Sequence, residues 1–219
     1  MSVRDNLSAV EGRIRAACER AGRRRDEVTL VAVSKTFPAS SVEEAVAAGA
    51  TDIGENRVQE ARDKKPQVGG SARWHLIGHL QSNKAKDAVR LFDVIETVDS
   101  TDLAQKIARA AEAAGKAQDV LLEVNVGKKP QKNGILPGDV ERIARDVQRI
   151  SSLRLLGLMA IPPHGSAEET RRWFRELRAM RDRLGLQELS MGMSEDFETA
   201  IEEGSTMVRI GRAIFGERG

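Results

Sequence analysis

Short apolar runs alternate with amphipathic stretches along nearly the whole chain. The runs are rich in Val, Ile and Leu and lack a regular polar alternation, which is typical of strands buried on both faces of a parallel sheet. The pattern predicts eight strands, at residues 29–34, 51–54, 73–77, 94–98, 120–126, 153–160, 189–193 and 207–210.

The stretches between these runs carry apolar residues three and four positions apart, which places them on one face of a helix. Capping residues and glycines frame several of them; Ser40 and Gly49, for example, mark the start and the end of a short helix. Helices are predicted at residues 3–21, 40–48, 58–65, 83–92, 100–114, 138–150, 167–184, 196–203 and 213–217.

Each predicted strand is followed by a helix, and this alternation requires a parallel sheet, which places the chain in the α/β class. Eight such units form either a doubly wound open sheet or a closed (β/α)8 TIM barrel, and eight is the number that closes the barrel. We predict a single barrel domain over residues 1–219. The additional N-terminal helix then lies across the bottom of the barrel or against its side.

Composition narrows the class of partner. The 35 basic and 33 acidic residues nearly cancel, so no charge excess indicates a nucleic acid or an anionic membrane as partner. Aromatic residues are 3% of the chain and Tyr is absent, which removes stacking platforms and one common acid–base group. A lone Cys18, no signal-peptide pattern and no apolar run of membrane-spanning length predict a cytoplasmic protein.

In a TIM barrel, active sites lie at the C-terminal ends of the strands, and Lys35 directly follows the first one. Desolvation lowers the pKa of a lysine, and the neutral amine is a nucleophile that condenses with aldehydes. The alternative is that Lys35 has reached the end of its strand and extends into water.

The loops after the last two strands of such barrels often hold a phosphate group. Here they contain Ser194, a hydroxyl donor, and Gly211, which allows close backbone approach. Strand alternation places Arg209 on the same face as Gly211. Each residue also has a simpler interpretation: Ser194 as a helix N-cap, Gly211 as a turn residue, and Arg209 in a salt bridge inside the barrel mouth.

The histidines do not form a convincing metal site. His75 and His79 are four residues apart, a spacing that binds metal on a helix, but their surroundings are typical of a strand. On a strand, this spacing separates them by roughly 13 Å. His164 follows two prolines in a loop, and no His, Cys or carboxylate cluster has ligand spacing, so no zinc site is predicted.

Six motifs distributed from residue 33 to residue 216 carry a resemblance to a known family. They read V-S-K-T, G-E-N-R-V-Q-E, W-H-L-I-G-H-L-Q-S-N-K, L-M-A-I-P, L-S-M-G-M-S and G-S-T-M-V-R-I-G-R-A-I-F-G. In this order they closely resemble the pyridoxal phosphate homeostasis (YggS/PROSC) family.

The resemblance implies a fold-type-III barrel like the N-terminal domain of alanine racemase, with pyridoxal 5'-phosphate (PLP) held as a Schiff base on Lys35. It implies phosphate contacts from Ser194 and Gly211, helped by the backbone of Arg212 and the turn at residues 204–206. The residues that it places around the cofactor are Lys35, Asn56, Ser194, Ser205, Thr206, Arg209, Gly211 and Arg212.

The resemblance also implies roles at the cofactor ring. Arg209 matches the arginine that faces the pyridine nitrogen, and Asn56 lies where the family presents a side chain near the ring. Arg57 departs from the pattern, because many relatives carry an aromatic residue there; this alters the rim of the pocket but does not reach the Schiff base.

These features favour a carrier of PLP over an enzyme. Arg209 is permanently charged and only donates, so it favours an unprotonated pyridine, whereas PLP is an efficient electron sink when that nitrogen is protonated. The related racemases share this arrangement but use a second base, a Tyr from an additional β domain. This chain has no Tyr and ends about where the barrel ends.

We therefore predict a monomeric protein that stores or buffers PLP or delivers it to PLP-dependent apo-enzymes. One alternative is a fold-type-III enzyme with weak racemase or lyase activity that uses His79, Asp99 or His164 as its base. Another is an aldolase that forms a Schiff base with sugar phosphates, since it needs the same lysine and phosphate site.

Overall fold

Eight parallel strands pair in chain order and close on themselves, because β1 pairs with β8 as well as with β2. The computed structural model describes residues 2–163 and 165–217. The strands are β1 (Thr29–Val33), β2 (Asp52–Glu55), β3 (Arg73–Leu76), β4 (Val94–Val98), β5 (Gln118–Glu123), β6 (Leu153–Met159), β7 (Glu188–Ser190) and β8 (Met207–Ile210). The predicted TIM barrel is confirmed and the open sheet is excluded.

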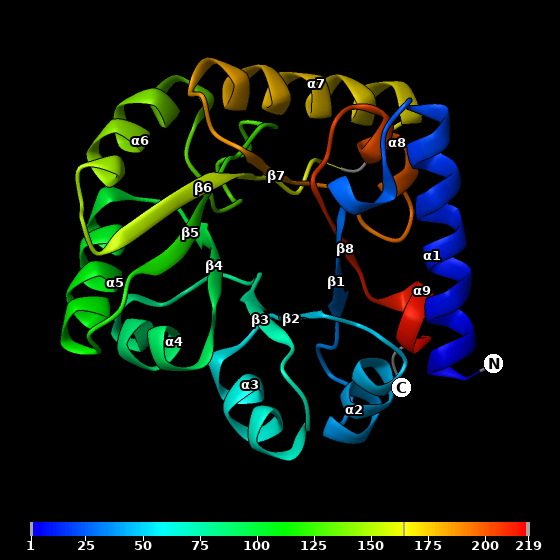
Figure 1. The fold of residues 1–219 in the computed structure, drawn as a ribbon. Helices are drawn as coiled ribbons and strands as arrows, with labels where there is room; N and C mark the ends of the chain where they lie inside the picture. The colour runs from blue at the N-terminus through cyan, green and yellow to red at the C-terminus, as the bar shows by residue number, and fades with distance from the viewer. Residues whose placement is uncertain (1, 164, 218–219) are drawn as a thin grey trace.

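The helices lie outside the ring of strands (Figure 1). The α-helices are α1 (Val3–Arg20), α2 (Ala39–Ala47), α3 (Val58–Lys64), α4 (Ala85–Leu91), α5 (Thr101–Ala113), α6 (Val140–Gln148), α7 (Ala167–Arg183), α8 (Phe197–Glu202) and α9 (Arg212–Phe215). Short 3₁₀ turns cover Arg25–Glu27, Lys65–Gln67, Ser82–Lys84 and Pro137–Asp139.

The additional helix α1 lies against the side of the barrel, where it packs on α8 and α9 (Figure 1). Its apolar face buries five residues: Leu7, Val10, Ile14, Ala17 and Cys18. Asn6 fixes the contact, since its Nδ2 donates to the carbonyl of Ile214 at 2.9 Å. Of the two placements expected for this helix, the side of the barrel is therefore the observed one.

Two strands, β5 and β7, end three residues earlier than their apolar runs predicted, whereas β1, β3 and β6 end one residue earlier. The seventh run continues to Met193, but β7 ends at Ser190 because Gly192 adopts a φ of 93°, in the left-handed region. A Cβ on Gly192 would lie 2.5 Å from the Cβ of Ala200, so the turn requires glycine. β5 ends at Glu123, and the chain then leaves the sheet to pair with Ile135 in a single bridge at Val124.

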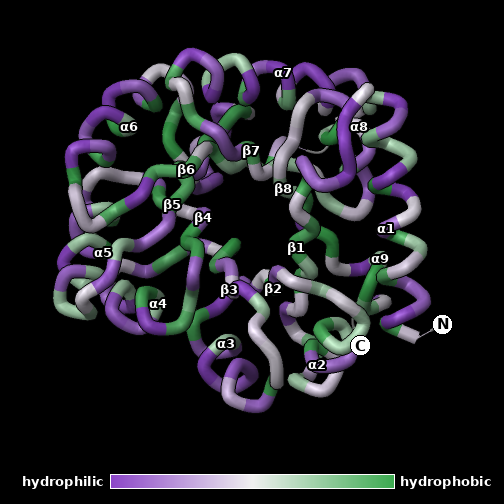
Figure 2. The backbone as a smooth tube through the Cα atoms, in the orientation of Figure 1, coloured by the Kyte–Doolittle hydropathy of each residue, from purple (hydrophilic) through white to green (hydrophobic). Residues whose placement is uncertain are grey.

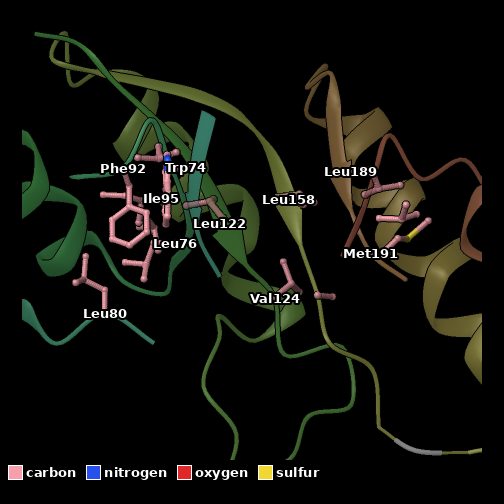
Figure 3. Packing of buried hydrophobic residues seen from close by; sticks show 14 of the residues in the cluster. Trp74, Leu76, Leu80, Phe92, Ile95, Leu122, Val124, Leu158, Leu189 and Met191 are labelled. Carbon is pink, nitrogen blue, oxygen red and sulfur yellow. The ribbon is translucent and has the colours of Figure 1, made fainter. Parts of the chain in front are cut away.

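The main hydrophobic core fills the space between the sheet and the helices. Trp74, Leu76, Phe92 and Ile95 pack there (Figure 3), and the apolar colouring in Figure 2 is concentrated on the strands and the inner sides of the helices. Residues that alternate with these face the inside of the barrel, where a smaller apolar cluster contains Val94, Leu121, Met159 and Met207. The buried polar side chains of His75, Glu96 and Arg209 lie on interior-facing positions of the strands as well.

Close packing between β6 and β7 gives a testable prediction. A Cβ added to Gly157 would lie 1.9 Å from the carbonyl oxygen of Glu188, which is backbone and cannot rotate away. We expect Gly157→Ala to lower the free energy of unfolding by about 3 kcal/mol or more, measured by urea denaturation. Gly12→Ala is the control, because nothing lies within 4 Å of its added methyl group. An unchanged midpoint for Gly157→Ala would contradict the packing.

Candidate functional site

A cavity of about 680 Å³ opens at the C-terminal ends of the strands. Its walls combine polar groups with apolar side chains such as Val33, Ile77 and Met193. Size and mixed lining are typical of a small-molecule site. Six of the eight residues predicted from the sequence line this cavity: Lys35, Asn56, Ser194, Arg209, Gly211 and Arg212.

Lys35 follows the end of β1 and its half-buried side chain lines the cavity. The chain turns sharply after it, since the N–H of Phe37 donates to the carbonyl of Ser34 at 3.1 Å. Thr36, within this turn, has a φ of 71°, which only glycine adopts easily. This turn places the Lys35 amine at a ligand site, where condensation with an aldehyde is chemically reasonable.

Arg209 is 4% exposed and lines the same cavity from β8, the strand that pairs with β1. Its Nη1 donates to the hydroxyl of Ser190 at 2.6 Å, and its Nη2 donates to the carbonyl of Ala160 at 2.9 Å. Burial lowers the pKa of this guanidinium, and the negative charges of Glu96, Glu123 and Asp196 oppose the shift. Arg209 therefore lines the cavity, and its guanidinium donates to a hydroxyl and a carbonyl oxygen rather than to the carboxylate of a salt bridge.

Ser194, Gly211 and Arg212 lie together at the end of the cavity formed by the loops after β7 and β8. A Cβ on Gly211 would lie 3.1 Å from the carbonyl oxygen of Val33, so glycine here also allows close contact with β1. The Arg212 side chain pairs with Glu195 on the rim. The cavity thus combines an amine, a buried guanidinium, a hydroxyl and a glycine-lined loop, which together fit a small ring that carries an aldehyde and an anionic group.

Comparison with known proteins identifies the family. The family model "Alanine racemase, N-terminal domain" matches residues 6–219. The pyridoxal phosphate homeostasis protein of Aquifex aeolicus is 42% identical over 226 residues, which cover 100% of this chain and 99% of that protein. The chain belongs to the pyridoxal phosphate homeostasis protein family.

Two solved structures show the same barrel. PipY of Synechococcus elongatus, solved with PLP bound, has a TM-score of 0.86 and 36% identity, covering 98% of this chain and 100% of that one. An unknown protein from Bifidobacterium adolescentis has a TM-score of 0.93 and 40% identity, covering 97% of this chain and 94% of that one. The resemblance noted in the sequence is confirmed.

Two expected site residues of this family member do not reach the cavity. Ser205 and Thr206 precede β8 and lie at the other end of the barrel, because β8 starts at Met207. The buried Ser205 hydroxyl lies 2.8 Å from the carbonyl of Met191, and Thr206 donates to the Glu188 carboxylate at 2.6 Å. These hydroxyls fasten β8 to β7, so the prediction that they contact the cofactor is corrected.

Inside the barrel, a row of hydrogen-bonded polar residues, here called the polar chain, leads from Asp52 to Arg209. The Ser190 hydroxyl, which accepts from Arg209, donates to the Glu96 carboxylate at 2.6 Å. His75 lies 2.8 Å from Glu96 through Nδ1 and 2.9 Å from Asp52 through Nε2. Since both ring nitrogens face carboxylates, both carry protons and His75 is an imidazolium. Burial alone lowers the pKa of His75, but the hydrogen bonds and charges of Asp52 and Glu96 raise it to about 9.

In the sequence, His75 was weighed only as a metal ligand, and the polar chain was not predicted. Glu96 and Ser190 are embedded in apolar strands, and only the period-two alternation of each strand could have indicated that they face the interior. Among the described residues, no group of three or more His, Cys, Asp or Glu side chains is placed to hold a metal ion. His75 instead balances the charges of Asp52 and Glu96 inside the barrel.

Glu123 is a further acidic group near Arg209 that the sequence did not indicate. Its Oε2 is buried and has no hydrogen-bond partner in the part of the chain that the structure describes. Burial raises the pKa of Glu123 to about 7, and repulsion from Asp99 adds to this rise. The group therefore changes its charge near neutral pH, beside the guanidinium that faces the cavity.

Two of the three bases considered for an enzymatic reaction, His79 and Asp99, are not among the residues that line this cavity. His79 lines a neighbouring hollow of about 530 Å³ together with Arg57, not the cavity that contains Lys35. Its Nδ1 is 3.5 Å from the carboxylate of Asp99. His164 lies outside the described residues.

Within residues 2–163 and 165–217, no helix is long and apolar enough to cross a membrane.

Proposed function

We propose that this chain binds PLP as a Schiff base on Lys35 and stores or buffers the cofactor or delivers it. The observation that carries this proposal is the convergence of Lys35, Arg209 and Ser194 on one cavity, in the barrel that PipY shows with PLP bound. When bound, PLP supplies a reactive aldehyde and an electron-withdrawing ring.

The side chains of the cavity have distinct roles in this proposal. Lys35 provides the amine, and Ser194 with the backbone at Gly211 and Arg212 donates hydrogen bonds to the phosphate. Arg209, fixed by Ser190 and Ala160, would face the ring nitrogen and favour its unprotonated form, because a guanidinium only donates hydrogen bonds. Asn56, which lines the cavity, would lie near the ring.

A carrier fits the surroundings of the cavity better than a racemase or lyase. The sequence contains no Tyr that could act as a second base, and His79 lies in the neighbouring hollow. An unprotonated ring nitrogen also weakens PLP as an electron sink. We propose that the chain acts as a monomer in the cytoplasm and that PLP-dependent apo-enzymes receive the cofactor; the buried free thiol of Cys18 is compatible with a reducing compartment.

The direct test is to follow PLP binding by absorbance and to locate the bond chemically. Adding PLP to the purified chain should produce the visible absorption band of a Schiff base. Borohydride reduction followed by peptide mass spectrometry should then place the reduced adduct on Lys35. An adduct spread over the surface lysines, or absent after reduction, would contradict the proposal.

A further inference from the structure

A second lysine close to Lys35 is buried and takes no part in lining the cavity. Lys64, the last residue of α3, has a side chain that is only 10% exposed. Its ammonium group donates to the carbonyl of Ser34 at 2.8 Å, to Glu55 at 2.7 Å and to Glu60 at 3.2 Å. An ammonium has three protons, so these three acceptors use its full hydrogen-bonding capacity.

The residues that this cluster holds lie on both sides of Lys35. Ser34 precedes it, and the Ser34 carbonyl accepts from Lys64 while also closing the turn with Phe37. Thr36 follows it, and the N–H of Thr36 donates to Glu60 at 2.8 Å. Lys64 and Glu60 therefore form hydrogen bonds with the backbone immediately before and after Lys35, respectively.

The backbone turn that contains Thr36 is strained. Thr36 has a φ of 71°, a region that costs a residue with a Cβ free energy and that persists only where the surrounding structure enforces it. Here the Thr36 N–H is bonded to Glu60, which is held in turn by Lys64. With this restraint removed, the backbone after Lys35 is free to relax toward an ordinary φ and to move the Lys35 side chain.

Glu55 explains why a charge is buried at this place. It is fully buried, accepts from the Ser34 hydroxyl at 2.6 Å and from Lys64, and its second oxygen has no partner among the described residues. Burial raises the pKa of this carboxyl, while Lys64 and Ser34 favour its charged form. The buried ion pair of Lys64 and Glu55 thus provides a fixed point beside the end of β1.

We propose that Lys64 and Glu60 are positioning residues that hold the strained Thr36 turn and thereby aim Lys35 into the cavity. The inference concerns the geometry of Lys35, and its consequence for cofactor affinity rests on the proposed function. Neither Lys64 nor Glu60 lines the cavity, so both act through the backbone of residues 34–36.

The test uses two variants and two readouts. Lys64→Met removes the ammonium, and Glu60→Ala removes the acceptor of the Thr36 N–H while leaving the Lys64–Glu55 pair intact. In both, hydrogen exchange of the amide of Thr36 should be about tenfold faster or more. The dissociation constant for PLP, measured by absorbance titration, should rise about tenfold, since a small misplacement of a reacting group is costly.

Rescue separates positioning from a general loss of structure. Glycine adopts a positive φ without strain, so adding Thr36→Gly to Lys64→Met should restore the PLP affinity to within about threefold of the parent chain. Arg62→Gln is the matched control, because Arg62 lies on the same helix and pairs with Asp87 at the surface. Its exchange rates and affinity should not change.

Each outcome bears on the proposal. Folded Lys64→Met and Glu60→Ala chains with unchanged exchange at Thr36 would overturn it, as would a Thr36→Gly addition that restores nothing. Should Lys64→Met not fold, the result for Glu60→Ala decides, because Glu60 is only partly buried. A parent chain that binds no PLP would refute the proposed function alone, since the exchange measurement needs no cofactor.

Discussion

Replacing Lys35 with alanine will abolish the covalent capture of PLP. A Schiff base requires a primary amine, and of the two described lysines that line the cavity, Lys35 and Lys132, only Lys35 lies at the end of β1. The variant should show no visible Schiff-base absorption on addition of PLP and no adduct after borohydride reduction. Binding that remains should come from the Ser194 and Gly211 end of the cavity and be roughly 100-fold weaker or more.

Lys35→Arg makes this test more specific. Arginine keeps the positive charge and most of the length of lysine, but it stays protonated in proteins and does not condense with the aldehyde. It should therefore behave like alanine in the absorbance assay, although it still attracts the phosphate. Lys86→Ala, at an exposed position on α4, should bind PLP as the parent chain does. Persistence of the band in Lys35→Ala would remove Lys35 from the proposed role.

The fold was predictable because its signal is local and repeated. Each unit carries a fully apolar run such as Thr29–Val33, whose burial on both faces leaves little choice but a parallel strand, followed by a helix with one apolar face. The ends of β5 and β7 were placed too late, because apolar residues continue past the strand in both. At β7 the left-handed φ of Gly192 ends the strand pairing, and the spacing of apolar residues does not indicate the φ of a glycine.

The cavity was predictable to the extent that strand direction determines it. Lys35, Asn56, Ser194, Arg209 and Gly211 all follow or end strands, and the C-terminal ends of parallel strands meet at one end of the barrel. Ser205 and Thr206 precede β8, so strand direction places them at the opposite end, and the family resemblance alone had assigned them to the cofactor.

The polar chain from Asp52 to Arg209 was not predictable, because its partners come from different strands. Asp52, His75, Glu96 and Ser190 belong to β2, β3, β4 and β7, and each appears in the sequence as one polar residue in an apolar strand. Which of them meet depends on closure of the barrel and on register, since Ser190 reaches Glu96 across the interior rather than along the sheet. The pattern of residues within a single strand indicates neither the closure of the barrel nor the register between strands.

His75 is expected to make the stability of the barrel depend on pH in the alkaline range. Its pKa is about 9 in the folded chain, whereas the ordinary value for a histidine without these partners is 6.5. Because the folded pKa is the higher one, the stabilisation is complete below pH 6.5, decreases as pH rises, and is lost above about pH 9. Its full size is about 3 kcal/mol of unfolding free energy.

Asp52 and Glu96 act in the opposite sense at acidic pH. Burial raises the pKa of each carboxyl, but His75, together with Thr51 and Arg73 at Asp52 and with Arg209 and Ser190 at Glu96, holds both pKa values below their ordinary range. Since these folded pKa values are lowered, their stabilisation is present at neutral pH and is lost as pH falls through the acidic range. The polar chain should therefore be most stabilising at weakly acidic pH, between the two losses.

His75→Phe isolates this effect. The ring keeps most of the volume but leaves Asp52 and Glu96 buried without their cation, so the free energy of unfolding should fall by about 3–5 kcal/mol at pH 6. Urea denaturation at several pH values should also show that the decrease between pH 6.5 and 9 disappears in this variant. His79→Phe, whose side chain is 46% exposed, should keep the parent slope. If the free energy of unfolding falls equally with alkaline pH in the parent chain and in His75→Phe, then His75 is not the buried cation. Another group would then balance the charges of Asp52 and Glu96.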